Sequence, residues 1–156
     1  STNNRKRQMK TLNTLLQTAF LASTLMFGAT TVQASELEVN FIDIERPVGQ
    51  LMVAIYDSEE AYNNKAQPLK YATVEADANT ITLNFDDLAD GTYALMLIHD
   101  LNQNGQMDIN AMGLPQDGYG FSNNVGMYGL PPFDAASFEL KEYASIDVIV
   151  RKPVNL

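Results

Sequence analysis

Residues 90–99 read DGTYALMLIH, and this stretch decides the fold class of the chain. The Asp-Gly pair is a turn signal, and almost every residue after it is apolar. An apolar run of about eight residues is short for a buried helix and is typical of a strand that is covered on both faces. We therefore expect a central β-strand over residues 92–99.

Other strands are expected on both sides of this one. Residues 81–85 and residues 37–41 alternate apolar and polar side chains, as half-buried strands do. Residues 51–55 are apolar on both faces, which predicts a second covered strand. Another strand is expected to begin at residues 138–140, and one over residues 146–150 ends the pattern. A weaker strand pattern lies at residues 71–75. Helix is nearly absent, apart from one turn over residues 58–64 with Ser58 as its N-cap.

About seven short strands separated by turn signals predict an all-β fold. The expected architecture is a single antiparallel β-sandwich, prealbumin-like or immunoglobulin-like, with one long loop over residues 100–135. This loop is rich in Asn, Gly, Asp and Pro, but its large aromatic residues predict that it is ordered. Three of them either pack the loop or line a platform for carbohydrate or peptide: Tyr119, Phe121 and Tyr128.

The first 34 residues have the pattern of a secretory signal peptide. A basic start is followed by an uncharged, mostly apolar run over residues 11–29 and by small residues at Val32 and Ala34. The basic residues are Arg5, Lys6, Arg7 and Lys10. The apolar run is interrupted by polar residues and is short for a membrane anchor. We expect cleavage of residues 1–34, one domain over residues 35–156 with no membrane span, and a periplasmic or extracellular location.

Removal of the leader makes the chain strongly acidic. The leader holds four of the ten basic residues and no acidic residue, so six basic residues remain against nineteen acidic ones, a net charge of −13. Such a chain is repelled by nucleic acid and by anionic lipid headgroups, and it attracts cations. The chain has no cysteine. Core packing, or core packing with a metal ion, must therefore hold the exported fold.

The loop begins with the spacing of a calcium-binding loop. Oxygen-bearing side chains stand at relative positions 1, 3, 5 and 9, glycine stands at position 6, and a backbone carbonyl is available at position 7. These residues are Asp100, Asn102, Asn104, Asp108, Gly105 and Gln106. Position 12 is Ala111, so Asp117 is the candidate for the missing carboxylate. The low charge predicts weak Ca²⁺ binding, about 0.1–1 mM; the alternative is a turn closed by Asx side chains alone.

Two residues next to this loop are expected to anchor it. His99, the only histidine, ends the central strand, and its ring is expected to bond a backbone group. The alternative is a general base acting with Asp100 or Asp117. Tyr93 is expected to tie a corner of the sandwich through its hydroxyl group. Ser122 lacks the flanking glycine of a nucleophile elbow and does not predict a hydrolase.

The runs at residues 91–94, 99–108 and 113–123 together resemble a family of exported bacterial proteins, the DUF2141 family. Its characteristic pattern reads G-x-Y-A, an apolar strand, H-D-x-N-x-N-G-x-x-D and then G-x-P-x-x-G-Y-G-F-S-N-N. The resemblance covers most of the chain after the leader. It implies a seven-stranded sandwich of the transthyretin or prealbumin type, and it implies no particular chemistry.

The function hypothesis is an exported, non-enzymatic sandwich module with a weakly calcium-stabilised loop and a binding or structural role in the cell envelope. Its partner would be an unidentified envelope component or a small ligand. Two alternatives stay open. One is a small periplasmic enzyme that uses His99 with Asp100 or Asp117. The other is a carrier that holds a small apolar ligand inside the sandwich.

Overall fold

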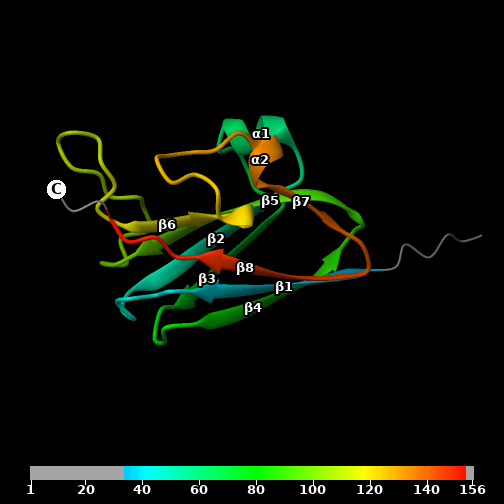
Figure 1. The fold of residues 1–156 in the computed structure, drawn as a ribbon, viewed down its shortest axis with the longest axis horizontal. Coiled ribbons are helices and arrows are strands. Elements are labelled where there is room, and N and C mark those ends of the chain that lie inside the picture. Colours follow the sequence, from blue (N-terminus) through cyan, green and yellow to red (C-terminus); the bar gives the residue numbers. More distant parts are fainter. Residues whose placement is uncertain (1–33, 154–156) are drawn as a thin grey trace, which may run out of the picture. The chain divides into compact units, whose positions relative to one another are not determined.

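The structure is a computed structural model, and it describes residues 34–153. The leader prediction falls on residues 1–34, of which all but the last lie outside the described residues. Within the described part, eight strands form two sheets (Figure 1). The elements are β1 (Ser35–Ile42), β2 (Gln50–Tyr56), α1 (Glu59–Asn63), β3 (Lys70–Glu75), β4 (Ile81–Leu88), β5 (Gly91–Asp100), β6 (Gly118–Phe121), η1 (Ser122–Asn124), α2 (Phe133–Ala136), β7 (Ser137–Leu140) and β8 (Tyr143–Ile149).

The smaller sheet has three strands in the order β4-β1-β8. β1 pairs antiparallel with β4 and parallel with β8. The parallel pair departs from the expected all-antiparallel pairing. It arises because the chain leaves β7 in the other sheet, turns over two residues and enters along the free edge of β1. Glu142 in that turn has a φ of 57°, in the left-handed region that non-glycine residues seldom adopt outside turns.

The larger sheet has the order β3-β2-β5-β6, and β7 also pairs with β5. β6 and β7 each cover part of β5: residues 96–99 pair with β6, and residues 91–94 pair with β7. β5 therefore has neighbours on both sides along most of its length. This confirms the expectation of a central strand at residues 92–99.

The core lies between the two sheets and contains the inward-facing residues of the alternating strands. Leu37, Val39 and Phe41 of β1 are fully buried, as are the inward residues of β2: Leu51, Val53 and Ile55. Leu95 and Leu97 of β5 join the same cluster. A buried aliphatic side chain contributes about 1.5–3 kcal/mol, so this layer is the main source of stability in a chain without disulfides.

The all-β sandwich prediction is confirmed, with one strand more than expected. The additional strand is β6, which lies within the predicted loop of residues 100–135. Its glycines are typical of a loop, but here they are required because neighbouring backbone leaves no room for a Cβ. A Cβ on Gly120 would lie 2.6 Å from the carbonyl oxygen of Ile149, and one on Gly118 would lie 2.8 Å from that of Arg151. The chain at and after the end of β8 thus passes too close to β6 for any side chain.

Two short helices cover part of the outer face of the larger sheet (Figure 1). α1 begins at the expected N-cap, where the Ser58 hydroxyl accepts a hydrogen bond from the Ala61 backbone N–H at 3.3 Å. Tyr62 of α1 is buried against Tyr56 and against Phe133 of α2, with ring centroids 5.7 and 5.6 Å apart. In the described part of the chain, no helix has the length and apolarity needed to cross a membrane.

Candidate functional site

The loop after β5 is organised first by Asp100, whose side chain is fully buried. Its carboxylate accepts hydrogen bonds from the backbone N–H groups of Asn104 at 3.2 Å and Gly105 at 2.8 Å. It also accepts one from Nε2 of Gln50 at 2.8 Å. Burial alone would raise the pKa of this carboxyl, but the hydrogen bonds outweigh burial and hold the pKa below its usual value. Asp100 is therefore a charged group that fixes the turn.

The polar side chains at the next alternate positions form one connected network. Asn102 and Asn104 donate from their amides to the two carboxylate oxygens of Asp108, at 2.7 and 2.8 Å. The amide oxygens of the same two residues accept backbone N–H groups two residues further on, at 3.1 and 2.9 Å. These are Asx turns. The candidate ligands Asp100, Asn102, Asn104 and Asp108 are thus gathered in one cluster, in which Gln106 takes part through its backbone N–H.

Asp117 joins the two ends of this loop. Its side chain is only 2% exposed. One carboxylate oxygen accepts the Leu101 N–H at 3.1 Å, and the other accepts the Asp108 N–H at 2.8 Å. The loop does fold back to bring Asp117 beside the first turn. Within the described residues, no three or more His, Cys, Asp or Glu side chains are grouped so that they could hold a metal ion.

The two candidate anchors, His99 and Tyr93, are both buried, at 4% exposure each. Nε2 of His99 lies 2.7 Å from the carbonyl oxygen of Val48. Because a carbonyl only accepts, Nε2 carries the proton and donates. The Tyr93 hydroxyl donates to the carbonyl oxygen of Ala89 at 2.6 Å. Each ring therefore ties β5 to a neighbouring loop: His99 to the segment before β2, and Tyr93 to the turn that precedes its own strand.

The Ser-Asn-Asn segment after β6 replaces missing backbone pairing with side-chain hydrogen bonds. Ser122 is fully buried, and its hydroxyl accepts the Leu95 N–H at 2.9 Å and donates to the carbonyl of Ala136. The Asn124 amide bonds β8 at both of its polar atoms, accepting from Ile149 N–H at 2.8 Å and donating to the Asp147 carbonyl at 3.1 Å. Ser122 is thus occupied in holding η1 against the strands.

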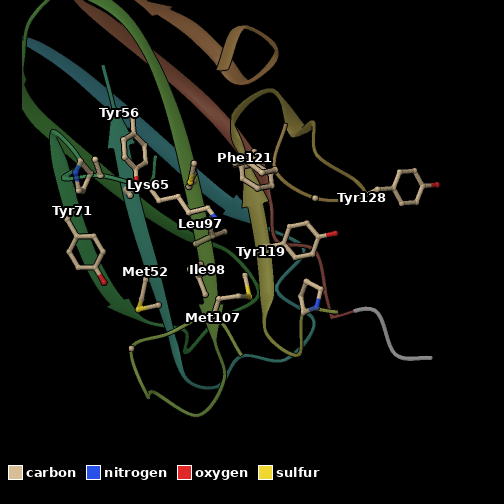
Figure 2. Close-up of a pocket in the computed structure, with 18 of the residues that line it drawn as sticks. Met52, Tyr56, Lys65, Tyr71, Leu97, Ile98, Met107, Tyr119, Phe121 and Tyr128 are labelled. Atoms are coloured by element: carbon tan, nitrogen blue, oxygen red, sulfur yellow. The ribbon is translucent and has the colours of Figure 1, made fainter. Parts of the chain in front are cut away.

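A hollow lies on the part of the outer sheet face that the helices leave uncovered (Figure 2). Its floor follows from the strand register. One cross-strand row runs Tyr71, Ala54, Met96, Phe121, and the next runs Thr73, Met52, Ile98, Tyr119. All of these residues except Thr73 line the hollow. The small Ala54 between Tyr71 and Met96 makes a depression in the first row. We call this hollow the outer groove.

Loops raise the walls of the outer groove. The loop after β5 contributes Met107, Leu114 and Pro115, and the segment after η1 contributes residues 127–130. The α1–β3 connection contributes Lys65, Ala66 and Pro68. The resulting volume is about 710 Å³, within the range of small-molecule sites. Several wall residues are solvent-exposed although apolar, such as Tyr128 at 97% and Met127 at 57%.

The outer groove is lined by methionine and aromatic side chains. Four methionines, Met52, Met96, Met107 and Met127, contribute to it, as do five aromatic residues: Tyr56, Tyr71, Tyr119, Phe121 and Tyr128. Methionine is flexible and polarisable and adapts to ligands of different shape. Neither His99 nor the aspartates of the loop line this hollow.

The loop residues are evident in the sequence, but most of the outer groove is not. Tyr119, Phe121 and Tyr128 were predicted either to pack the loop or to form a platform, and all three line the groove. The remaining signal was in β2, where Met52, Ala54 and Tyr56 are apolar on the face opposite the core. That pattern predicted a cover on both faces. The helices cover only the Tyr56 end, which leaves the rest of the face open.

Residues 34–153 thus form an eight-stranded β-sandwich with an Asx-rich loop beside an apolar groove. The chain belongs to the family described as "Uncharacterized protein conserved in bacteria (DUF2141)", whose model matches residues 39–147. This match confirms the resemblance noted in the sequence. A search of curated proteins found no match, and neither did a search of solved structures.

Proposed function

We propose that this protein is an exported, non-enzymatic binding module that holds a small apolar ligand in the outer groove. The observation that carries the proposal is the groove itself: a concave, apolar surface of about 710 Å³ outside the core. Exposed apolar side chains gathered in one concave place mark binding sites more often than isolated ones do. The export part of the proposal is supported by the leader pattern of residues 1–34.

The hollow lies outside the sandwich, whereas the carrier hypothesis places the ligand inside it. Side chains that are fully buried, such as Phe41, Leu51 and Leu95, fill the space between the sheets. The loop with Asp100 and Asp117 then has a supporting role. It holds Met107, Leu114 and Pro115 in place as one wall of the groove.

Binding of a neutral, environment-sensitive apolar dye tests this proposal. We expect the dye to bind the wild-type protein, and Tyr71→Asp to weaken binding about fivefold or more, because a charge and the loss of an aromatic wall both disfavour an apolar ligand. Dye fluorescence titration measures the dissociation constant. The matched control is Tyr143→Asp: Tyr143 lies on β8, lines no part of the groove, and is 57% exposed against 60% for Tyr71. Equal weakening in both variants, or no binding to the wild type, would contradict the proposal.

We further propose that the loop of residues 100–108 binds Ca²⁺ weakly, with Asp117 close to it. The support is the sequence spacing together with the gathering of Asn102, Asn104 and Asp108 into one cluster. Each amide oxygen accepts a single N–H. An amide oxygen has two lone pairs, so one remains for a cation.

The calcium proposal predicts a thermal shift. At 10 mM Ca²⁺, a site with a dissociation constant of about 0.1–1 mM stabilises the native state by about 1.4–2.7 kcal/mol. Thermal unfolding in calcium, compared with chelator and with Mg²⁺ at equal ionic strength, measures this change. Asp108→Ala should abolish the shift. An identical midpoint in calcium and in chelator would refute a site that is linked to folding.

A further inference from the structure

The outer groove has a charge composition opposite to that of the chain. The protein carries nineteen acidic residues, yet no Asp or Glu lines the groove. The single charged side chain in its lining is Lys65, one of only six basic residues after the leader. A hollow that excludes the abundant charge and includes the rare one is complementary to a ligand with an apolar body and a negative group.

Lys65 is presented to the groove by a fixed turn. Its backbone has a φ of 47°, and its N–H donates to the Tyr62 carbonyl at 3.1 Å as α1 ends. Its side chain extends over the sheet in Figure 2. Among the described residues, the two ion pairs join Lys141 to Glu139 and Lys152 to Glu45, so neither involves Lys65. The Lys65 ammonium is therefore available to a ligand.

The Tyr56 hydroxyl provides a second polar contact at the same end of the groove. Figure 2 shows the Tyr56 ring and the Lys65 side chain in the same half of the groove, whereas Met52 and Met107 lie in the other half. Burial raises the pKa of Tyr56, and no hydrogen bond within the described protein counteracts that rise. The hydroxyl is therefore protonated and can donate to an anionic oxygen. One end of the groove offers an ammonium and a hydroxyl donor, and the rest offers thioethers, rings and aliphatic groups.

We propose that the ligand of the outer groove is an anionic single-chain amphiphile, with its apolar chain over the Met52–Met107 end and its small anionic head between Lys65 and Tyr56. This inference rests on the proposed function, since it names the ligand class of the same site. The flexible methionines suit an alkyl chain that has no fixed shape. The ammonium and hydroxyl suit a carboxylate, which forms charge-assisted hydrogen bonds with both.

The acidic surface of the protein opposes this ligand only at long range. Charges separated by more than about 8 Å of solvent are largely screened at physiological ionic strength, whereas a head group in contact with Lys65 is not. Repulsion by the acidic surface therefore slows the approach of the anionic ligand, whereas the contact with Lys65 stabilises the bound state. The same surface charge still disfavours docking on an anionic membrane, where many headgroups face the protein at once.

Isothermal titration calorimetry with two matched probes tests the proposal. Decanoate and decan-1-ol, both below the concentration at which they aggregate, share an alkyl chain and differ in the charge of the head. We expect decanoate to bind the full chain about 3- to 10-fold more tightly than decanol, because one charge-assisted contact increases affinity by about that factor. In Lys65→Gln the ratio of the two affinities should fall close to one. Lys141→Gln is the control, because Lys141 lies outside the groove and pairs with Glu139, and there the ratio should persist.

The outcomes of the titration distinguish the ligand class, the head-group contact and the proposed function. Equal affinity of the wild type for decanoate and decanol would overturn the anionic ligand class and leave the proposed function standing. A preference for decanoate that survives in Lys65→Gln would overturn the assignment of the head-group contact. If neither probe binds, the proposed function itself fails together with the inference.

Discussion

Replacement of Gly49 by alanine should lower the free energy of unfolding by about 3–5 kcal/mol. Gly49 lies just before β2 with a φ of +76°, and an added Cβ would lie 2.2 Å from the carbonyl oxygen of Asp100. It would also lie 2.8 Å from Cα of Leu101. Both obstacles are backbone atoms at the end of the central strand, so no side-chain rotation relieves the overlap. β2 and β5 must separate at the base of the candidate loop.

A second glycine variant separates the two causes of this effect. Gly113 has a φ of +78°, and a Cβ there would meet nothing within 4 Å. Gly113→Ala therefore costs only the backbone preference, about 1–2 kcal/mol. Urea unfolding of both variants measures the difference, which is the cost of the overlap alone. Equal destabilisation would mean that the close approach of Gly49 to β5 is not a constraint on the fold. Whole domains are stable by only about 5–15 kcal/mol. We therefore expect that a side chain larger than that of alanine at position 49 abolishes the native state.

The strands could be predicted from the sequence because their side-chain pattern is local. The alternation of Leu37, Val39 and Phe41 with polar residues fixes which face is buried wherever the strand is placed. The pairing partners could not be predicted in the same way, because they depend on contacts between distant segments. The parallel pairing of β1 with β8 and the strand β6 are examples. Gly118 and Gly120 lower strand propensity, and only the backbone at residues 149–151 explains them.

The part of the candidate site that one continuous segment forms could be predicted from the sequence. The part that segments distant in the sequence form together could not. The loop ligands and anchors all stand within residues 93–117, so their spacing could be read directly from the sequence. The outer groove combines β2, β3, β5 and β6 with three connections. Lys65 is an example of a residue whose role could not be predicted from the sequence. In the sequence it is one basic residue in a polar turn, and its proposed role in binding depends on the acid-free surface around it. Such a surface exists only after the register of four strands is fixed.

Replacement of Asp117 by alanine should lower the free energy of unfolding by about 2–5 kcal/mol. Asp117 is only 2% exposed, and its carboxylate accepts hydrogen bonds from two backbone N–H groups, those of Leu101 and Asp108. Without it, both donors lose their partners in a place that water reaches poorly, and each costs about 1–3 kcal/mol. Asp117→Asn should fall between wild type and Asp117→Ala, because its amide keeps one acceptor oxygen but turns an N–H toward the other backbone donor. Urea unfolding gives the size of each effect.

Hydrogen exchange then shows whether the loss occurs where the geometry places it. The amides of Leu101 and Asp108 should lose protection in Asp117→Ala, while those of β1 and β2 change only with the global stability. Asp86→Ala is the matched control, since Asp86 is an exposed acid on β4 and its loss removes the same charge without freeing the donors held by Asp117. In a chain with nineteen acidic residues, removing one exposed charge should be neutral or slightly stabilising. If Asp86→Ala and Asp117→Ala destabilise equally, the effect is one of net charge, and Asp117 does not hold the loop.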